Sequence, residues 1–241
     1  FPMMLVLSTL AMLHDHEAGY PIGGSLHLAE NLAQRYLDLG GVFHYRSRVN
    51  RILVEENRAV GLRLEDGSEH RADVVLSAAD GHSTLFDLLE GRYISATQRA
   101  YYRNLPVSKS ILQVSLGVAD DFSAEAPAVN FPLPEPVYLG NVRHERLVLK
   151  HYCFDPTMAP PGHSTLSVWC EADYDYWRSM RAHPKHYRGA KDLVAQQVIT
   201  ALEGRYPGLS EKIEVIDVAT PITHERYTGN WRGAFAGWAL S

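Results

Sequence analysis

The chain has 241 residues, of which 46% are hydrophobic and 21% charged, and its formal net charge is -5. These values are typical of a folded globular protein with one large or two small domains, and they exclude intrinsic disorder. The acidic balance gives no reason to expect nucleic acid or an anionic membrane surface as a partner.

The two cysteines, Cys153 and Cys170, form no CxxC pattern. This excludes a disulfide framework and a cysteine zinc site, and it favours a reducing compartment. The longest apolar run, 3–13, is shorter than the roughly 20 residues of a transmembrane helix and lacks the basic flank of a signal peptide. We therefore expect a cytoplasmic protein that has no transmembrane segment and can touch a membrane peripherally.

The first elements in chain order are two helices. Residues 3–14 predict a buried helix, and 14–19 form a polar turn. Ser25 is a suitable N-cap for the second helix, and Gly40-Gly41 provides its C-cap. The apolar positions of this helix recur at helical spacing, at Leu28, Leu32, Tyr36 and Leu39.

A β-meander follows the second helix. Asp66-Gly67 predicts a tight hairpin, because both residues tolerate the positive φ of such turns. The continuously apolar run 74–76 indicates a strand that is covered on both faces. The strands of the meander are predicted at 42–45, 48–55, 59–64 and 69–77.

The second half of the chain predicts an antiparallel sheet with helices on one side. The proline-rich stretch 125–136 is predicted to be a loop. We place a domain boundary near Pro106. The predicted helices are 83–89, 96–104, 174–182 and 189–203, and the predicted strands are 110–118, 146–154, 165–172 and 213–218. The fold class is thus α+β.

Three groups of short motifs together carry a family resemblance. In order, they are GYPIGG at 19–24, Gly40-Gly41 and 49–52; Gly61, Asp66-Gly67, Ala72-Asp73 and 77–80; and 220–223, 225–230 and 233–238. Each motif alone has little specificity. In this order and spacing they resemble phytoene dehydrogenases, carotenoid isomerases and retinol saturases, which are FAD-dependent oxidoreductases of the amine-oxidase-like superfamily.

The resemblance implies a division of the chain. Residues 1–17 would be a helix of the substrate domain, and 18–95 a β-meander edge of the Rossmann-like FAD-binding domain. Residues 96–220 would be a mostly antiparallel substrate-binding domain, and 221–241 would return toward the flavin. The chain starts at Phe1 without a Met and contains no GxGxxG fingerprint, so we interpret it as an internal fragment.

Site residues follow from the same resemblance. Val49 would meet the adenine of FAD through its backbone, and the small Ala78 and Ala79 would let the chain pass close to the cofactor. Gly23-Gly24, which precedes a helix, would form a phosphate-binding turn. Core packing is the alternative for Val49, and a packed turn is the alternative for the two alanines. We expect FAD in the full-length protein and not in this fragment.

The aromatic residues of the C-terminal stretch are the candidates for substrate binding. Tyr227, Trp231 and Trp238 are interspersed with glycines, which suits a flat conjugated ligand against a flavin ring. Packing at a domain junction is the alternative. The string 14–17, with its four metal-ligand residue types, is interpreted as a solvated loop, because adjacent residues rarely converge on one ion. No metal site is therefore expected.

The expected function is oxidoreduction of a small apolar polyene or isoprenoid by dehydrogenation, saturation or isomerisation. No catalytic acid or base is identified from the sequence. One alternative is an amine-oxidase-type flavoenzyme with a carboxylate and tyrosine lining. The other is a non-catalytic prenyl-binding carrier of the Rab escort or GDP-dissociation-inhibitor type.

Overall fold

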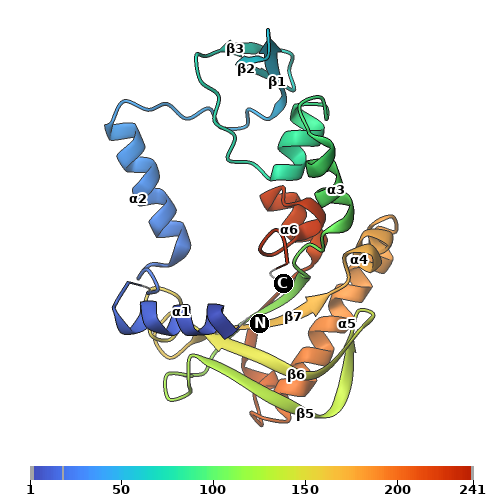
Figure 1. Cartoon of the computed structure of the whole chain (residues 1–241). Helices are drawn as coiled ribbons and strands as arrows, with labels where there is room; N and C mark the ends of the chain where they lie inside the picture. The colour runs from blue at the N-terminus through green and yellow to red at the C-terminus, as the bar shows by residue number, and fades with distance from the viewer. Residues whose placement is uncertain (1–2, 18, 240–241) are drawn as a thin grey trace.

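The computed structural model describes residues 3–17 and 19–239. Phe1, part of the predicted turn 14–19 and the last two residues of the return segment lie outside the described residues. Two antiparallel sheets, one small and one large, are joined by helices (Figure 1). The predicted α+β class is confirmed.

The small sheet is the predicted hairpin region. It contains β1 (Val49–Glu55), β2 (Arg58–Leu64) and β3 (Glu69–Arg71), in the order β1-β2-β3. Gly67 has a φ of 87°, and the Asp66 carboxylate accepts the Ser68 amide at 2.9 Å. The hairpin at Asp66-Gly67 is therefore confirmed.

Two strand predictions in this region are wrong. The strand predicted over 69–77 ends at Arg71, and Val74 and Leu76 are 81% and 91% exposed. The apolar run 74–76 is therefore not a strand covered on both faces in the described chain. Residues 42–45 also form no strand, because Phe43 packs its ring against Tyr36 of the preceding helix at 4.8 Å.

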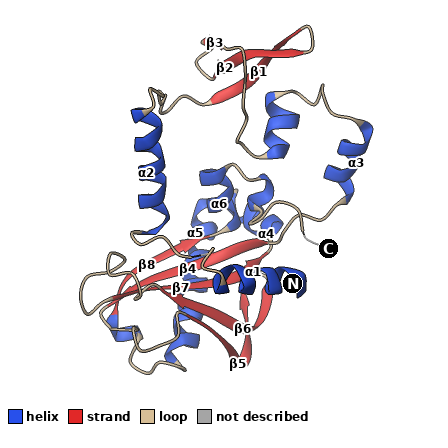
Figure 2. Cartoon of the chain, turned by 60° about the vertical axis from the view of Figure 1, so that its left-hand side comes forward, coloured by secondary structure: helices blue, strands red, loops and turns tan. Residues whose placement is uncertain are grey.

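The large sheet contains five strands in the order β5-β6-β7-β4-β8, and all neighbours are antiparallel. Figure 2 shows these strands side by side. They are β4 (Ser110–Val118), β5 (Ala128–Leu139), β6 (Val142–His151), β7 (Ser164–Ala172) and β8 (Ile213–Ala219).

The proline-rich segment that was predicted to be a loop belongs largely to β5. Proline removes a ladder hydrogen bond and is tolerated mainly on edge strands and at bulges. β5 is an edge strand, and its pairing with β6 breaks between Pro132 and Val137, so Pro134 and Pro136 lie in the irregular stretch. The loop prediction is wrong because it ignored this exception.

The hydrophobic core lies between one face of the large sheet and two helices, α4 (Tyr174–Arg181) and α5 (Pro184–Glu203). Alternate residues of β4 are fully buried there, as expected for a strand with one covered face. Trp177 of α4 is completely buried in this core. Strand and helix residues at most 1% exposed in this core include Leu112, Val114, Leu116, Leu139, Leu147, Leu166, Val168, Val198 and Leu202.

Two helical elements connect the small sheet to the large one. The π-helix η1 (Ser83–Leu88) and α3 (Ala96–Asn104) lie between β3 and β4, so the helices predicted over 83–89 and 96–104 are confirmed in position. The short η2 (Ser210–Lys212) precedes β8, and α6 (Pro221–Thr228) and η3 (Trp231–Gly233) follow it.

The N-terminal helices are α1 (Met3–His14) and α2 (Gly24–Asp38). α2 ends at Asp38, two residues before Gly40, which adopts a φ of 86°, so the predicted C-cap region is confirmed. The described side chains of α1 are exposed, in contrast to the buried helix predicted there. The apolar residues of α1 could not predict this exposure, because burial depends on the presence of a neighbouring surface. Among the described residues, no helix is long and apolar enough to cross a membrane.

Candidate functional site

The C-terminal segment returns along the start of β4. Ser108 donates its amide to the Gly237 carbonyl at 2.7 Å, and Ala239 donates its amide to the Pro106 carbonyl at 2.9 Å. Deeper in the sheet, the Ser110 hydroxyl donates to the Arg232 carbonyl at 2.7 Å. These bonds hold the predicted return segment against the connection between the two sheets.

The sharp turn after α6 depends on glycine. Gly229 ends α6 with a φ of 73°, and Gly233 follows with a φ of 59°. A Cβ atom at Gly233 would lie 2.3 Å from the Pro221 carbonyl oxygen, which is too close for any side chain. Glycine therefore lets the segment fold back on the first turn of α6 and aims the aromatic residues at η1 and α3.

The aromatic junction, as we call it, consists of His82, Phe86, Tyr102, Trp231 and Trp238. The His82 and Trp231 rings stack at 4.5 Å with an interplanar angle of 6°, and His82 also stacks on Phe86 at 4.6 Å. Tyr102 contacts Trp238 at 4.8 Å and meets Trp231 edge-on at 6.1 Å. Aromatic pairs at these separations stabilise by about 0.5–1.5 kcal/mol each beyond their area burial.

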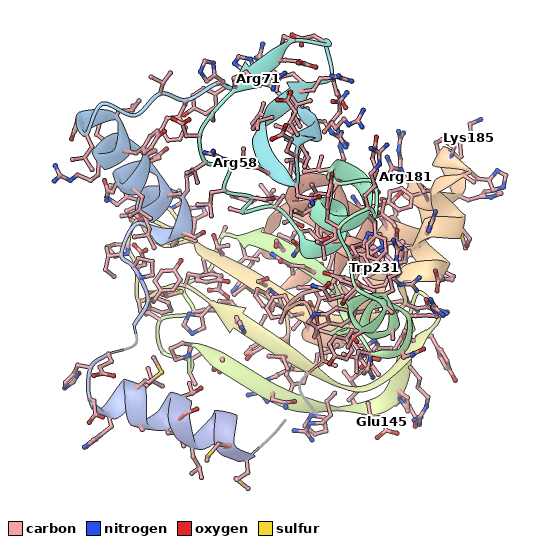
Figure 3. The ribbon with its side chains drawn as sticks, turned by 45° about the horizontal axis from the view of Figure 1, so that its top comes forward. Arg58, Arg71, Glu145, Arg181, Lys185 and Trp231 are labelled. Carbon is pink, nitrogen blue, oxygen red and sulfur yellow. The ribbon has the colours of Figure 1, made fainter. Side chains whose placement is uncertain are left out.

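The aromatic junction is only partly closed. His82, Phe86, Tyr102 and Trp231 are half-buried, and Trp238 is exposed. Burial, with a smaller effect from the Asp80 carboxylate, raises the pKa of the Tyr102 phenol above its ordinary value of 10.0. Tyr102 is therefore a neutral hydrogen-bond donor at neutral pH. The junction offers apolar ring surface at the connection between the sheets (Figure 3, Trp231).

The three predicted substrate residues do not all meet. Trp231 and Trp238 share the junction through Tyr102, whereas Tyr227 lies on the outer side of α6, is 77% exposed and contacts Arg226, whose guanidinium is 5.5 Å from its ring. The substrate role of all three stays a prediction. His82, Phe86 and Tyr102 were missed at the level of sequence, and the signal for His82 was its position two residues after the 77–80 motif.

The residues expected at the adenosine end of FAD fit that role. Val49 begins β1, which is an edge of the small sheet, so its outer edge faces no other strand of the described chain. Ala78 and Ala79 are exposed in the segment between β3 and η1 and present no bulky side chain. A backbone edge and a small-residue segment leave room for a nucleotide. The assignment of these three residues stays a prediction.

Gly23 and Gly24 lie elsewhere. They start α2 at its end near α1, while the small sheet is beyond the other end of this helix (Figure 1). The Gly23 amide donates to the buried Asp155 carboxylate at 2.8 Å, and the Thr157 hydroxyl and amide donate to the same group at 2.7 and 3.0 Å. In the described chain, the anion that binds to the Gly23-Gly24 turn is therefore the Asp155 side chain. A cofactor role for Gly23 and Gly24 stays a prediction.

Replacing Asp155 by asparagine is expected to loosen α2. The hydrogen bonds from Thr157, and from the Gly23 and Gly24 amides, hold the pKa of this carboxyl below its ordinary value of 3.8. A lowered pKa means that the charged form stabilises the fold above pH 4, and that this contribution is lost as the pH falls through the lowered pKa. Hydrogen exchange over 24–38 should accelerate in the variant at neutral pH, and in the parent protein only in strong acid.

Asp121→Asn is the matched control, since Asp121 caps an exposed loop through the Ser123 amide at 2.8 Å. Equal exchange over α2 in the parent and the Asp155 variant would contradict the role given to Asp155.

No group of three or more histidine, cysteine or acidic side chains within 3–17 and 19–239 could hold a metal ion. Residues 14–17 are exposed, and they form part of no such group among the described residues.

Comparison with known proteins places this geometry in a family. A family model described as flavin containing amine oxidoreductase matches residues 3–236. A prolycopene isomerase of Daucus carota is 29% identical over 97% of the chain and 38% of its own length, and a neurosporene-forming phytoene desaturase of Cereibacter sphaeroides is 28% identical over 90% and 44%. An oxidoreductase from Methanosarcina mazei shares the fold at 18% identity, with a TM-score of 0.56 over 83% of this chain and 43% of its own.

The chain spans less than half the length of these relatives. The family model covers both sheets and every residue of the aromatic junction except Trp238, from α1 into the return segment. The chain therefore belongs to the flavin containing amine oxidoreductase family.

Proposed function

We propose that the whole protein is an FAD-dependent oxidoreductase that acts on an apolar polyene of the carotenoid or retinoid kind by dehydrogenation, saturation or isomerisation. In this proposal the large sheet is the main part of the substrate domain, and the small sheet is one edge of the flavin domain. Relatives named as a prolycopene isomerase, phytoene desaturases and an all-trans-retinol 13,14-reductase support the polyene substrate.

The observation that carries the proposal is the aromatic junction. It joins η1, next to the predicted cofactor residues, to the return segment along the large sheet. Phe235 of the same return segment meets Trp169 of β7 edge-on at 5.6 Å, which places a further aromatic contact between this segment and the large sheet. Flat rings that are half-covered in this way favour a conjugated apolar chain over a polar amine.

FAD, when bound, supplies hydride acceptance and donation. The chain's own residues would hold its adenosine end, with the Val49 backbone at the edge of β1 and with Ala78 and Ala79 beside it. Trp231 and Trp238 would orient the polyene and keep water from the reacting carbons. The Tyr102 phenol, kept protonated, could donate a hydrogen bond without releasing a proton.

A cytoplasmic location and a peripheral contact with a membrane are part of the same proposal. An apolar polyene partitions into lipid, and α1 and α2 expose many apolar side chains. The exposed residues of these helices include Met3, Met4, Leu7, Leu10, Leu26 and Leu32. No nucleic acid is proposed as a partner.

Flavin content tests the proposal. The whole protein should purify yellow with about one FAD per chain, whereas residues 1–241 alone should purify colourless, because the described chain holds only an open edge for the cofactor. The measurement is the flavin-to-protein absorbance ratio after gel filtration. A whole protein that binds no flavin would overturn the proposal and would favour the carrier alternative.

A further inference from the structure

A hollow beside α6 shares no lining residue with the aromatic junction. It has a volume of about 360 Å³ and is bordered by α4, α5, β8 and α6. Its lining residues are Arg181, Tyr187, Lys191, Asp217, Val218, Ile222, Thr223, Arg226 and Tyr227. We call it the basic pocket.

The charge of the basic pocket is unbalanced. Arg181, Lys191 and Arg226 line it against a single carboxylate, Asp217. Within 3–17 and 19–239 none of these three cations forms an ion pair, whereas Arg232 nearby is paired with Asp175 at 2.6 Å. This concentration of positive charge stands out in a chain with a net charge of -5.

Positive charge extends from the basic pocket on one side. A neighbouring hollow of about 390 Å³ shares Arg181 and adds Arg178 and Arg232 against Glu225, whereas one of about 410 Å³ on the other side holds Arg188 and Lys191 against Asp192 and Asp217. Arg181 and Lys185 project from the same end of the helical layer (Figure 3). An anion that approaches past Arg178 and Arg181 therefore meets a positive field before it reaches the basic pocket.

The form of the pocket distinguishes it from an ordinary solvated helix face. Its three cations come from three different elements, and its floor is apolar, since Val218 and Ile222 are only 5% and 4% exposed. Tyr187 is held in place because its hydroxyl lies 2.6 Å from that of the buried Thr220. A solvated face would present its charges outward from one helix and would have no such floor.

The side chains are also positioned against rings. The Lys191 ammonium lies 5.9 Å from the centre of the Tyr187 ring, and the Arg226 guanidinium lies 5.5 Å from that of Tyr227. Such contacts orient a cation without neutralising it. The donors of Arg181, Lys191 and Arg226 thus remain available to a ligand with several acceptor oxygens.

We propose that the basic pocket binds a phosphate ester, with the phosphate oxygens between Arg181, Lys191 and Arg226 and the organic part over Ile222 and Tyr227. Three cations against one carboxylate match a dianionic group. Arginine and lysine are the side chains that recognise phosphate oxygens. The ligand is a free phosphate ester or the headgroup of a phospholipid, which share this chemistry.

The test measures binding to the whole protein by titration calorimetry with glycerol 3-phosphate, a soluble phosphate ester, and by co-sedimentation with phosphatidylcholine vesicles that contain or lack phosphatidic acid. Lys191→Gln and Arg226→Gln should each weaken binding of the recognised probe about tenfold, which is the loss of one hydrogen bond to a charged group. Lys185→Gln is the matched control, because this cation lies on the same patch outside the pocket lining. It should change binding little.

Binding of glycerol 3-phosphate identifies a free ester as the ligand, and binding of phosphatidic acid vesicles alone identifies a lipid headgroup. Either result supports the proposal if the Lys191 and Arg226 variants lose that binding. Failure of both probes to bind overturns it, as does an equal loss in all three variants, which would indicate a diffuse charge effect. Flavin content and polyene turnover do not enter this readout, so its outcome is independent of the proposed redox function.

Discussion

Replacing Trp231 by alanine is expected to lower polyene turnover by the whole protein roughly tenfold, since one lost aromatic contact of about 1.4 kcal/mol in the transition state has that effect. Trp231 stacks on His82 and contacts Tyr102, so its loss opens the surface on which the polyene is proposed to lie. FAD content should stay nearly intact, because Val49, Ala78 and Ala79 are not part of the aromatic junction.

A matched control variant and a double-mutant cycle with His82 make this result specific. Tyr138→Ala removes an exposed aromatic ring on the edge strand β5, away from the junction, and should leave turnover unchanged. His82→Ala should combine with Trp231→Ala less than additively, because the two rings share one contact. A Trp231 variant that loses its flavin or does not fold would show that Trp231 only packs the junction and binds no substrate.

The largest expected effect on stability is that of Trp177→Ala. Trp177 is completely buried between the sheet and α5, and it meets Tyr176 and Tyr187 edge-on at 5.4 and 5.9 Å. Truncating a buried tryptophan to alanine removes its contacts and leaves a cavity, which costs about 3–5 kcal/mol. The free energy of unfolding from urea denaturation measures this change.

Trp177→Phe should cost far less than the alanine variant. The Trp177 Nε1 atom is buried and has no hydrogen-bond partner among the described residues, so phenylalanine removes an unsatisfied donor while it keeps most of the volume. Leu193→Ala, at a 60% exposed position of α5, should change stability by less than about 0.5 kcal/mol. Equal losses in the phenylalanine and alanine variants would contradict the account of this core position.

Local chemistry made several elements predictable. The turn at Asp66-Gly67 requires a positive φ that Gly67 supplies, so the hairpin follows from two adjacent residues. The alternation of Leu112, Val114 and Leu116 likewise predicts one covered face of β4, and the structure buries all three against the helical layer. In these cases the determining interaction is near in the chain or repeats with the period of the element.

The errors occurred where a distant neighbour decides the outcome. Pro134 and Pro136 predict a loop, unless the strand lies at the edge of a sheet and its register breaks there, as in β5. The apolar Val74 and Leu76 predict burial, yet they are exposed in the described chain. Strand order and the presence of a covering surface are properties of the assembled fold, which a single segment does not encode.

The candidate site likewise combines a feature that the sequence predicts with contacts that it does not. The sequence predicted the glycine-spaced aromatic return segment, but not that Trp231 would stack on His82, about 150 residues earlier in the chain. Nor did it predict that Asp155 would supply the anion for the turn at Gly23-Gly24. Both contacts join segments that are far apart in sequence and carry no local pattern that links them.

The most direct measurement of the central claim is the anaerobic reaction of the flavin-loaded whole protein with a polyene, followed by product analysis and by the visible flavin spectrum. The account predicts a product with altered double bonds, formed only by flavin-loaded protein and less by the Trp231 variant. Benzylamine, as a polar amine, should leave both the flavin spectrum and the amine unchanged. Reduction of the flavin by benzylamine, together with an unchanged polyene, would contradict it.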